Sequence, residues 1–159
     1  MIEKILIATD GSGSAREVLE FGLDLAAKQD AEASVLHVAP RVDAIPCVSF
    51  AMATPTIPHK LSEHDQKPLH EALEIAEEKS ILVETALLQG NPADEIVTYA
   101  DTIDADLIVV GSRGHSAVAS ALIGSVSRSV LHESRRPVLV VRGTHVAAEA
   151  GVPARAVVR

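Results

Sequence analysis

The residues best suited to chemistry lie in one segment, where glycine and serine recur at fixed intervals. It reads GSRGHSAVASALIGSVS over residues 111–127 and contains Gly111, Gly114 and Gly124, the last followed directly by Ser125. The apolar run LIVV precedes the segment and a helical pattern follows it, so the glycines fall where a buried strand passes into a helix. Glycine lets the backbone approach a ligand closely, and the first turn of a helix offers N–H groups without partners. The spacing therefore predicts an anion-binding loop.

A second polar group stands where the first apolar segment of the chain ends. Ala8 and Thr9 are followed by Asp10 and the turn-forming pair Gly11-Ser12. An aspartate in this place has two interpretations, which the residues alone leave open. It could hydrogen-bond a ribose or a nucleobase, or hold a divalent ion beside phosphates. Alternatively, it caps the following helix or begins a turn.

The chain offers little that would serve as a catalytic centre. His37 lies inside the apolar pattern Leu36-His37-Val38, so we expect it to be packed and hydrogen-bonded rather than a catalytic base. The seven histidines are scattered without metal-ligand spacing, and we expect the single cysteine, Cys47, to be incidental. The motif GxxxxGK[ST] is absent, and the first turn lacks the third glycine of the dinucleotide fingerprint. These observations favour a binding site without catalytic residues.

The elements that must position these residues alternate between strand and helix. Strand patterns cover residues 2–9, 33–39, 81–88, 106–111 and 137–142, and helical patterns cover 14–29, 69–79, 91–103 and 125–134. Parallel neighbours need helical crossovers, so the alternation predicts a single doubly wound α/β sheet of five parallel strands with helices on both faces. In such sheets a ligand binds beyond the carboxyl ends of the strands, where the winding reverses.

Prolines near two expected helix starts, and two segments without periodicity, are the remaining local features of the chain. The pair Asn91-Pro92 is typical of a helix start, with asparagine as the cap and proline as the first residue. Pro68 is interpreted as the first residue of a helix or as a kink just upstream of one. Residues 40–60 contain four prolines and no periodicity, and residues 143–159 form a small-residue tail with no clear element.

Composition narrows the class of protein. A chain of 159 residues, 47% of them hydrophobic, is expected to form one domain with a substantial core. A single cysteine suits a reducing compartment, and the start of the chain suggests no cleavable signal, so we expect a cytoplasmic protein. No apolar stretch approaches the roughly 20 residues that span a bilayer. A net charge of −8 with two Phe, one Tyr and no Trp argues against nucleic-acid binding.

The glycine loop resembles the ATP-binding signature of the universal stress protein family. Two residues separate the first pair of glycines, nine separate the second glycine from Gly124-Ser125, and the apolar Ala121-Leu-Ile123 precedes that pair. The resemblance covers roughly residues 1–142, which we take as the nucleotide-binding domain, and leaves 143–159 as a tail. It implies the strand order 3-2-1-4-5. It also implies ATP as the ligand, with ADP or AMP as alternatives and with Mg or Mn left open.

The resemblance implies a binding role for twelve residues, which are Ala8, Thr9, Asp10, Val38, Gly111, Arg113, Gly114, His115, Gly124, Ser125, Val126 and Ser127. Main-chain groups near Val38 would pair with the adenine edge. Gly124 and Ser125 would present N–H groups to the phosphates, with the Ser125 hydroxyl and a further hydroxyl from Ser127. Arg113 and His115 would face ribose or phosphate, although an exposed loop position is an equal alternative for His115.

The function that follows is regulatory, with nucleotide occupancy changing the protein's shape or partners and with at most slow ATP hydrolysis. One alternative is a dimeric interaction protein of the same fold that binds no nucleotide, and another is an ATPase or a nucleotide transferase. We also expect a homodimer through the strand at 137–142. Its core, Val138-Leu-Val-Val141, is apolar on both faces yet falls at a sheet edge in the implied order.

Overall fold

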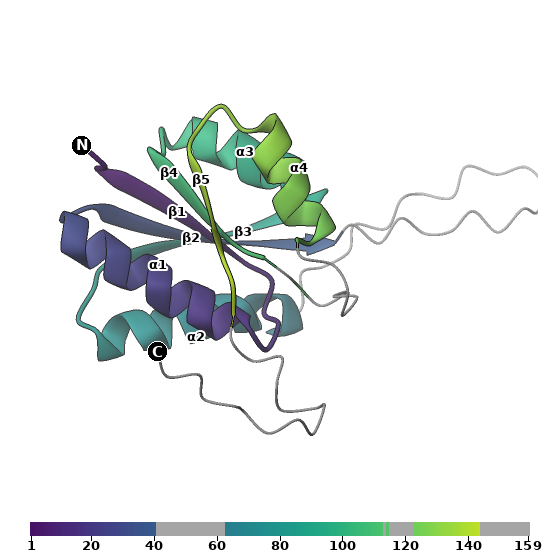
Figure 1. The fold of residues 1–159 in the computed structure, drawn as a ribbon. Helices are drawn as coiled ribbons and strands as arrows, with labels where there is room; N and C mark the ends of the chain where they lie inside the picture. The colour runs from purple at the N-terminus through teal and green to yellow at the C-terminus, as the bar shows by residue number, and fades with distance from the viewer. Residues whose placement is uncertain (41–62, 113, 115–122, 144–159) are drawn as a thin grey trace, which may run out of the picture.

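The sheet of this protein has the predicted order. The computed structural model describes residues 1–40, 63–112, 114 and 123–143. In these residues the strands are β1 (Lys4–Thr9), β2 (Glu32–Pro40), β3 (Val83–Gly90), β4 (Leu107–Gly111) and β5 (Val138–Val141), and the helices are α1 (Ala15–Gln29), α2 (Glu63–Glu78), α3 (Pro92–Thr102) and α4 (Ser125–Glu133). The strands are parallel and lie in the order β3-β2-β1-β4-β5 (Figure 1). The prediction of a doubly wound α/β sheet is confirmed.

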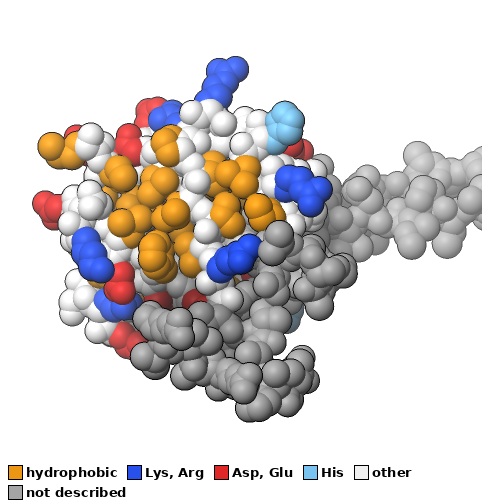
Figure 2. Space-filling model, viewed as in Figure 1, with side chains coloured by type: hydrophobic (Ala, Val, Ile, Leu, Met, Phe, Trp, Pro, Cys, Tyr) orange, Lys and Arg blue, Asp and Glu red, His pale blue; other side chains and the backbone are white. Residues whose placement is uncertain are grey.

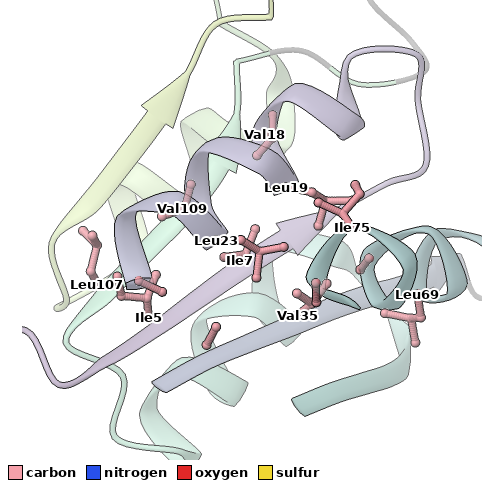
Figure 3. Close-up of a cluster of buried hydrophobic side chains, with 14 residues drawn as sticks. Ile5, Ile7, Val18, Leu19, Leu23, Val35, Leu69, Ile75, Leu107 and Val109 are labelled. Carbon is pink, nitrogen blue, oxygen red and sulfur yellow. The ribbon is translucent and has the colours of Figure 1, made fainter. Parts of the chain in front are cut away.

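Helices cover both faces of the sheet because the strands are apolar on both. Successive residues of a strand point to opposite faces, so Ile5 and Ile7 of β1 pack with α1 and α2, whereas Leu6 packs with α3 and α4. Figure 3 shows the first of these clusters, with side chains of α1 and α2 lying against β1 and β2. Gly22 lets α1 approach the sheet, since a Cβ there would lie 2.7 Å from Ile7 Cδ1.

The expected helix at 69–79 begins earlier than predicted. It starts at Glu63, so Pro68 lies inside the helix, and the interpretation of Pro68 as its first residue is wrong. The first turns of α2 are polar and show no apolar periodicity, which is why the pattern missed them. Pro68 itself is buried and contacts the turn at Gly11.

Other element boundaries agree with the prediction to within two residues. The strand expected from residue 81 begins at Val83, because Ser80 has a positive φ of 56° and the Ile81 N–H still bonds to Ala76 O of α2 at 2.9 Å. Asn91 caps α3 as expected, its side chain accepting a hydrogen bond from the Ala93 N–H at 3.1 Å. The proline-rich segment after residue 40 and most of the tail lie outside the described residues.

The winding reverses at the middle of the sheet. From β1 the chain proceeds outward to β2 and β3, then crosses back to β4 on the other side of β1 and continues outward to β5. The carboxyl ends of β1 and β4 therefore lie side by side at the place where ligands bind in sheets of this kind. None of the described helices is long and apolar enough to cross a membrane.

Candidate functional site

A cavity of about 360 Å³ opens at this reversal point. Ten of the twelve predicted residues are described by the structure, and all ten line the cavity, namely Ala8, Thr9, Asp10, Val38, Gly111, Gly114, Gly124, Ser125, Val126 and Ser127. The other two, Arg113 and His115, lie outside the described residues. The volume falls within the range of about 300–1,000 Å³ typical of small-molecule sites.

Part of the cavity wall is apolar. Leu36 and Val38 of β2, Ile96 of α3 and Val110 of β4 line it and belong to the core beneath α3 and α4. The sequence reasoning picked out only Val38 of these four, because the others look like ordinary core residues. Such a wall suits a flat, weakly polar group such as a nucleobase.

Next to this wall, β2 extends beyond its pairing with β1. The register between β1 and β2 ends at the pair Thr9–His37, so within the described chain Val38 and the residues after it have no partner in β1. Val38 lines the cavity at this point. The position is consistent with main-chain recognition of a base, as the resemblance implied.

The opposite part of the cavity is formed by the start of α4. Gly124 occupies the cap position with an extended backbone, and no side chain of the described residues caps this helix start. The first helical hydrogen bond runs from the Arg128 N–H to Gly124 O at 3.1 Å. The preceding N–H groups of the helix, those of Ser125, Val126 and Ser127, belong to residues that line the cavity and are the donors a helix start offers to an anion.

Two expected phosphate donors have other partners. The Gly124 N–H, expected to face a phosphate, donates to Ser112 O at 2.7 Å in this structure. The hydroxyl of Ser127, which is 4% exposed, donates to Gly111 O at 2.5 Å instead of pointing its hydrogen at a ligand. Both bonds hold the start of α4 against the end of β4, so these two residues shape the site.

The loop is also tied to the edge strand. The Ser112 N–H donates to Val141 O of β5 at 2.7 Å, and Ser112 O receives the bond from Gly124. Ser112 is buried, at 3% exposure. One residue thus connects β5, the end of β4 and the start of α4, and the sequence carried no signal for this role.

The turn-forming interpretation of Asp10 is confirmed, and its contact to a ligand stays a prediction. Its Oδ1 accepts a hydrogen bond from the Ser12 N–H at 2.9 Å, which is the turn-forming role, and the residue also lines the cavity. Its Oδ2 faces Gly114 so closely that a Cβ on this glycine would collide with it. Gly114 is therefore required for the close approach of the two loops, and Asp10 is the one carboxylate among the described lining residues.

His37 is a packed histidine, as predicted. Its Nδ1–H donates to Thr9 O at 2.8 Å, and the side chain is 8% exposed. The bond joins the ends of β1 and β2 at the rim of the site. In the part of the chain that the structure describes, no group of three or more His, Cys, Asp or Glu side chains is arranged to hold a metal ion.

A parallel sheet of this order, with a cavity at the point where the winding reverses, is the arrangement in which α/β domains bind ligands. The universal stress protein family model matches residues 1–142. Universal stress protein MJ0531 of Methanocaldococcus jannaschii is 35% identical over 144 residues, covering 89% of this chain and 83% of that protein. Universal stress protein YxiE of Bacillus subtilis is 37% identical over 150 residues, which cover 89% of this chain and 100% of that protein. The chain belongs to the universal stress protein family.

Solved structures agree with this assignment. A universal stress protein crystallised in complex with cAMP is 26% identical, covers 88% of this chain and 96% of its own, and superimposes with a TM-score of 0.65. A universal stress protein from Archaeoglobus fulgidus is 25% identical and has a TM-score of 0.65. The match covers 88% of this chain and 93% of that protein.

Proposed function

We propose that this protein binds an adenine nucleotide, ATP in the first place, and acts as a regulatory protein rather than an enzyme. The observation that carries the proposal is the cavity itself. It combines an apolar wall, beside the part of β2 that extends beyond its pairing with β1, with the start of α4, and ten predicted binding residues line it. The relative crystallised with cAMP, an adenine nucleotide, supports the same ligand class.

The two parts of the cavity suit the two parts of a nucleotide. The base would lie against Leu36, Val38 and Ile96, with its hydrogen-bonding edge toward the main chain that β1 leaves unpaired after His37. The phosphates would lie at the start of α4, where N–H groups and the helix dipole favour negative charge. ADP and AMP would fill the same site less completely. Asp10 is the candidate for a contact to ribose or to an accompanying Mg or Mn ion.

The proposal of a regulatory role rather than an enzymatic one rests on the surroundings of two described side chains, His37 and Asp10. A hydrolase needs a general base within reach of the attacking water. His37 is buried with its Nδ1–H held by Thr9 O, and Oδ1 of Asp10 accepts a hydrogen bond from the Ser12 N–H. These bonds favour a structural role for His37 and a ligand-contacting role for Asp10 over general-base catalysis. The rival function, a slow ATPase, predicts steady phosphate release that Ser125→Ala reduces, and a turnover assay separates the two.

We also propose that the protein is a homodimer through β5. This strand pairs only with β4 in the described sheet, and all four of its residues remain partly exposed. Figure 2 shows hydrophobic side chains gathered in the middle of the face that carries β5 in Figure 1. An unpaired apolar edge invites pairing, and the same strand of a second copy would close the contact by two-fold symmetry.

Nucleotide binding is tested by mass analysis of the denatured protein and by calorimetry. We expect an adenine nucleotide to be released, and ATP to rebind in the micromolar range, near −8 kcal/mol. GTP should bind at least tenfold more weakly, since one mispaired hydrogen bond to the base suffices for this ratio. Gly124→Val should abolish binding in a folded protein. The proposal falls if the protein releases no nucleotide and binds none at millimolar concentration.

A further inference from the structure

The described residues that line the cavity carry only two charges. One is the carboxylate of Asp10, and the other is the guanidinium of Arg128 in α4. Arg113, the arginine that the family resemblance pointed to, lies outside the described residues. Arg128 is not among the twelve predicted binding residues, because an arginine within a helical pattern is typical of surface charge.

The side chain of Arg128 is not committed to a protein partner. It is exposed, and among the described residues it forms no ion pair or side-chain hydrogen bond. Two other arginines behave differently. Arg136 bonds to Asp101 and Asp104, each at 3.1 Å, and Arg16 bonds to Glu20 at 2.9 Å. Arg128 therefore keeps its planar set of five donors available to an anion.

Helix geometry directs this side chain toward the site. Arg128 is the fourth residue of α4, and the Cα–Cβ bonds of a helix tilt toward its N-terminus, so the side chain lies over the first turn. That turn holds Ser125, Val126 and Ser127, which line the same cavity. A cation near a helix start interacts unfavourably with the helix dipole, so helix stability does not account for an arginine at this position.

We propose that Arg128 is a phosphate-binding residue and that it makes the site favour nucleotides with longer phosphate chains. This inference rests on the proposed adenine-nucleotide site and adds a determinant of ligand class to it. A guanidinium binds phosphate oxygens in a bidentate manner, and each further phosphate adds charge and acceptors for it. Adenosine offers Arg128 nothing to bind, AMP offers one phosphate, and ATP offers three.

The test compares the affinities of adenosine, AMP, ADP and ATP for the full chain, by calorimetry, in the unmodified protein and in Arg128→Gln. We expect the variant to bind ATP at least tenfold more weakly than the unmodified protein does. Its affinity for AMP should fall by a smaller factor, and its affinity for adenosine should stay within twofold. Arg128→Lys keeps the charge without the planar fork and should recover part of the loss. Arg135→Gln is the matched control, because this exposed arginine follows α4 and does not line the cavity. It should leave all four affinities unchanged.

The outcomes separate the two proposals. If the unmodified protein binds ATP and Arg128→Gln binds it equally well, or loses the same factor for adenosine as for ATP, the role of Arg128 is refuted and the nucleotide site stands. If the unmodified protein binds none of the four ligands, the nucleotide site itself is refuted and the role of Arg128 with it. A loss that grows with the number of phosphates supports both.

Discussion

Replacing either of two serines in the first turn of α4 by alanine should affect a different property, stability for Ser127 and ATP binding for Ser125. Ser127 is buried and its hydroxyl donates to Gly111 O at 2.5 Å, so Ser127→Ala leaves a main-chain acceptor at the end of β4 without its donor. A hydrogen bond of this kind contributes about 0.5–1.5 kcal/mol, and an unsatisfied buried group costs about 1–3 kcal/mol. We expect the free energy of unfolding to fall by about 1–2 kcal/mol and the Tm by roughly 2–4 °C for each kcal/mol.

Ser125 is exposed and lines the cavity at the start of α4. Ser125→Ala should change the free energy of unfolding by less than about 0.5 kcal/mol, as is usual for a surface position. Its effect should instead appear in binding, because a hydrogen bond to a charged group contributes about 1.5–3 kcal/mol. Since about 1.4 kcal/mol corresponds to a factor of ten, we expect ATP affinity to fall tenfold or more.

The assay pairs urea unfolding without nucleotide with calorimetric titration of ATP, for both variants and for Ser129→Ala. Ser129 lies in the same helix but does not line the cavity, so its replacement controls for the general effect of Ser→Ala in α4. An unchanged free energy of unfolding in Ser127→Ala would show that the bond to Gly111 does not hold the loop. Unchanged ATP affinity in Ser125→Ala would refute the placement of the phosphates at this helix start.

Three further predictions concern the sheet and its edges. Val140→Lys should convert the proposed dimer to monomers or insoluble protein by placing a charge on β5, and light scattering showing the unmodified protein as a monomer at tens of micromolar would rule this interface out. Gly22→Ala should lower the free energy of unfolding by about 1–3 kcal/mol in urea titrations, because the added methyl group overlaps Ile7; unchanged stability would mean that α1 shifts freely. Hydrogen bonds from two main-chain N–H groups at the start of the chain hold the pKa of Asp106 below its usual value of 3.8. This contribution to stability is complete above that value and is lost as the pH falls through the lower folded pKa, so the stability difference between the unmodified protein and Asp106→Asn should shrink on acidification, and a constant difference would contradict the reasoning.

Several features of this protein were readable from the sequence because short-range interactions produce them. The pair Asn91-Pro92 predicted the start of α3, since an asparagine side chain caps a helix two residues away. The spacing of apolar residues predicted five strands alternating with helices, because both faces of a parallel sheet must be buried. The glycine spacing predicted an anion-binding loop, and the family resemblance that it carries implied twelve binding residues, ten of which line the cavity. The strand order 3-2-1-4-5, by contrast, came from the family resemblance, because periodicity does not say which strands are neighbours.

Only the tertiary structure decided which groups of the glycine loop face the cavity. Gly124 and Ser127 look like phosphate donors in the sequence, yet their donors bond to Ser112 O and Gly111 O. Those partners come within reach because β4 lies between β1 and β5 and positions the loop beside the start of α4. Arg128 enters the site for the same reason, since only the placement of α4 turns its side chain toward the cavity. The residue types thus follow from the local pattern, whereas the choice of partner for each donor depends on packing between segments far apart in the chain.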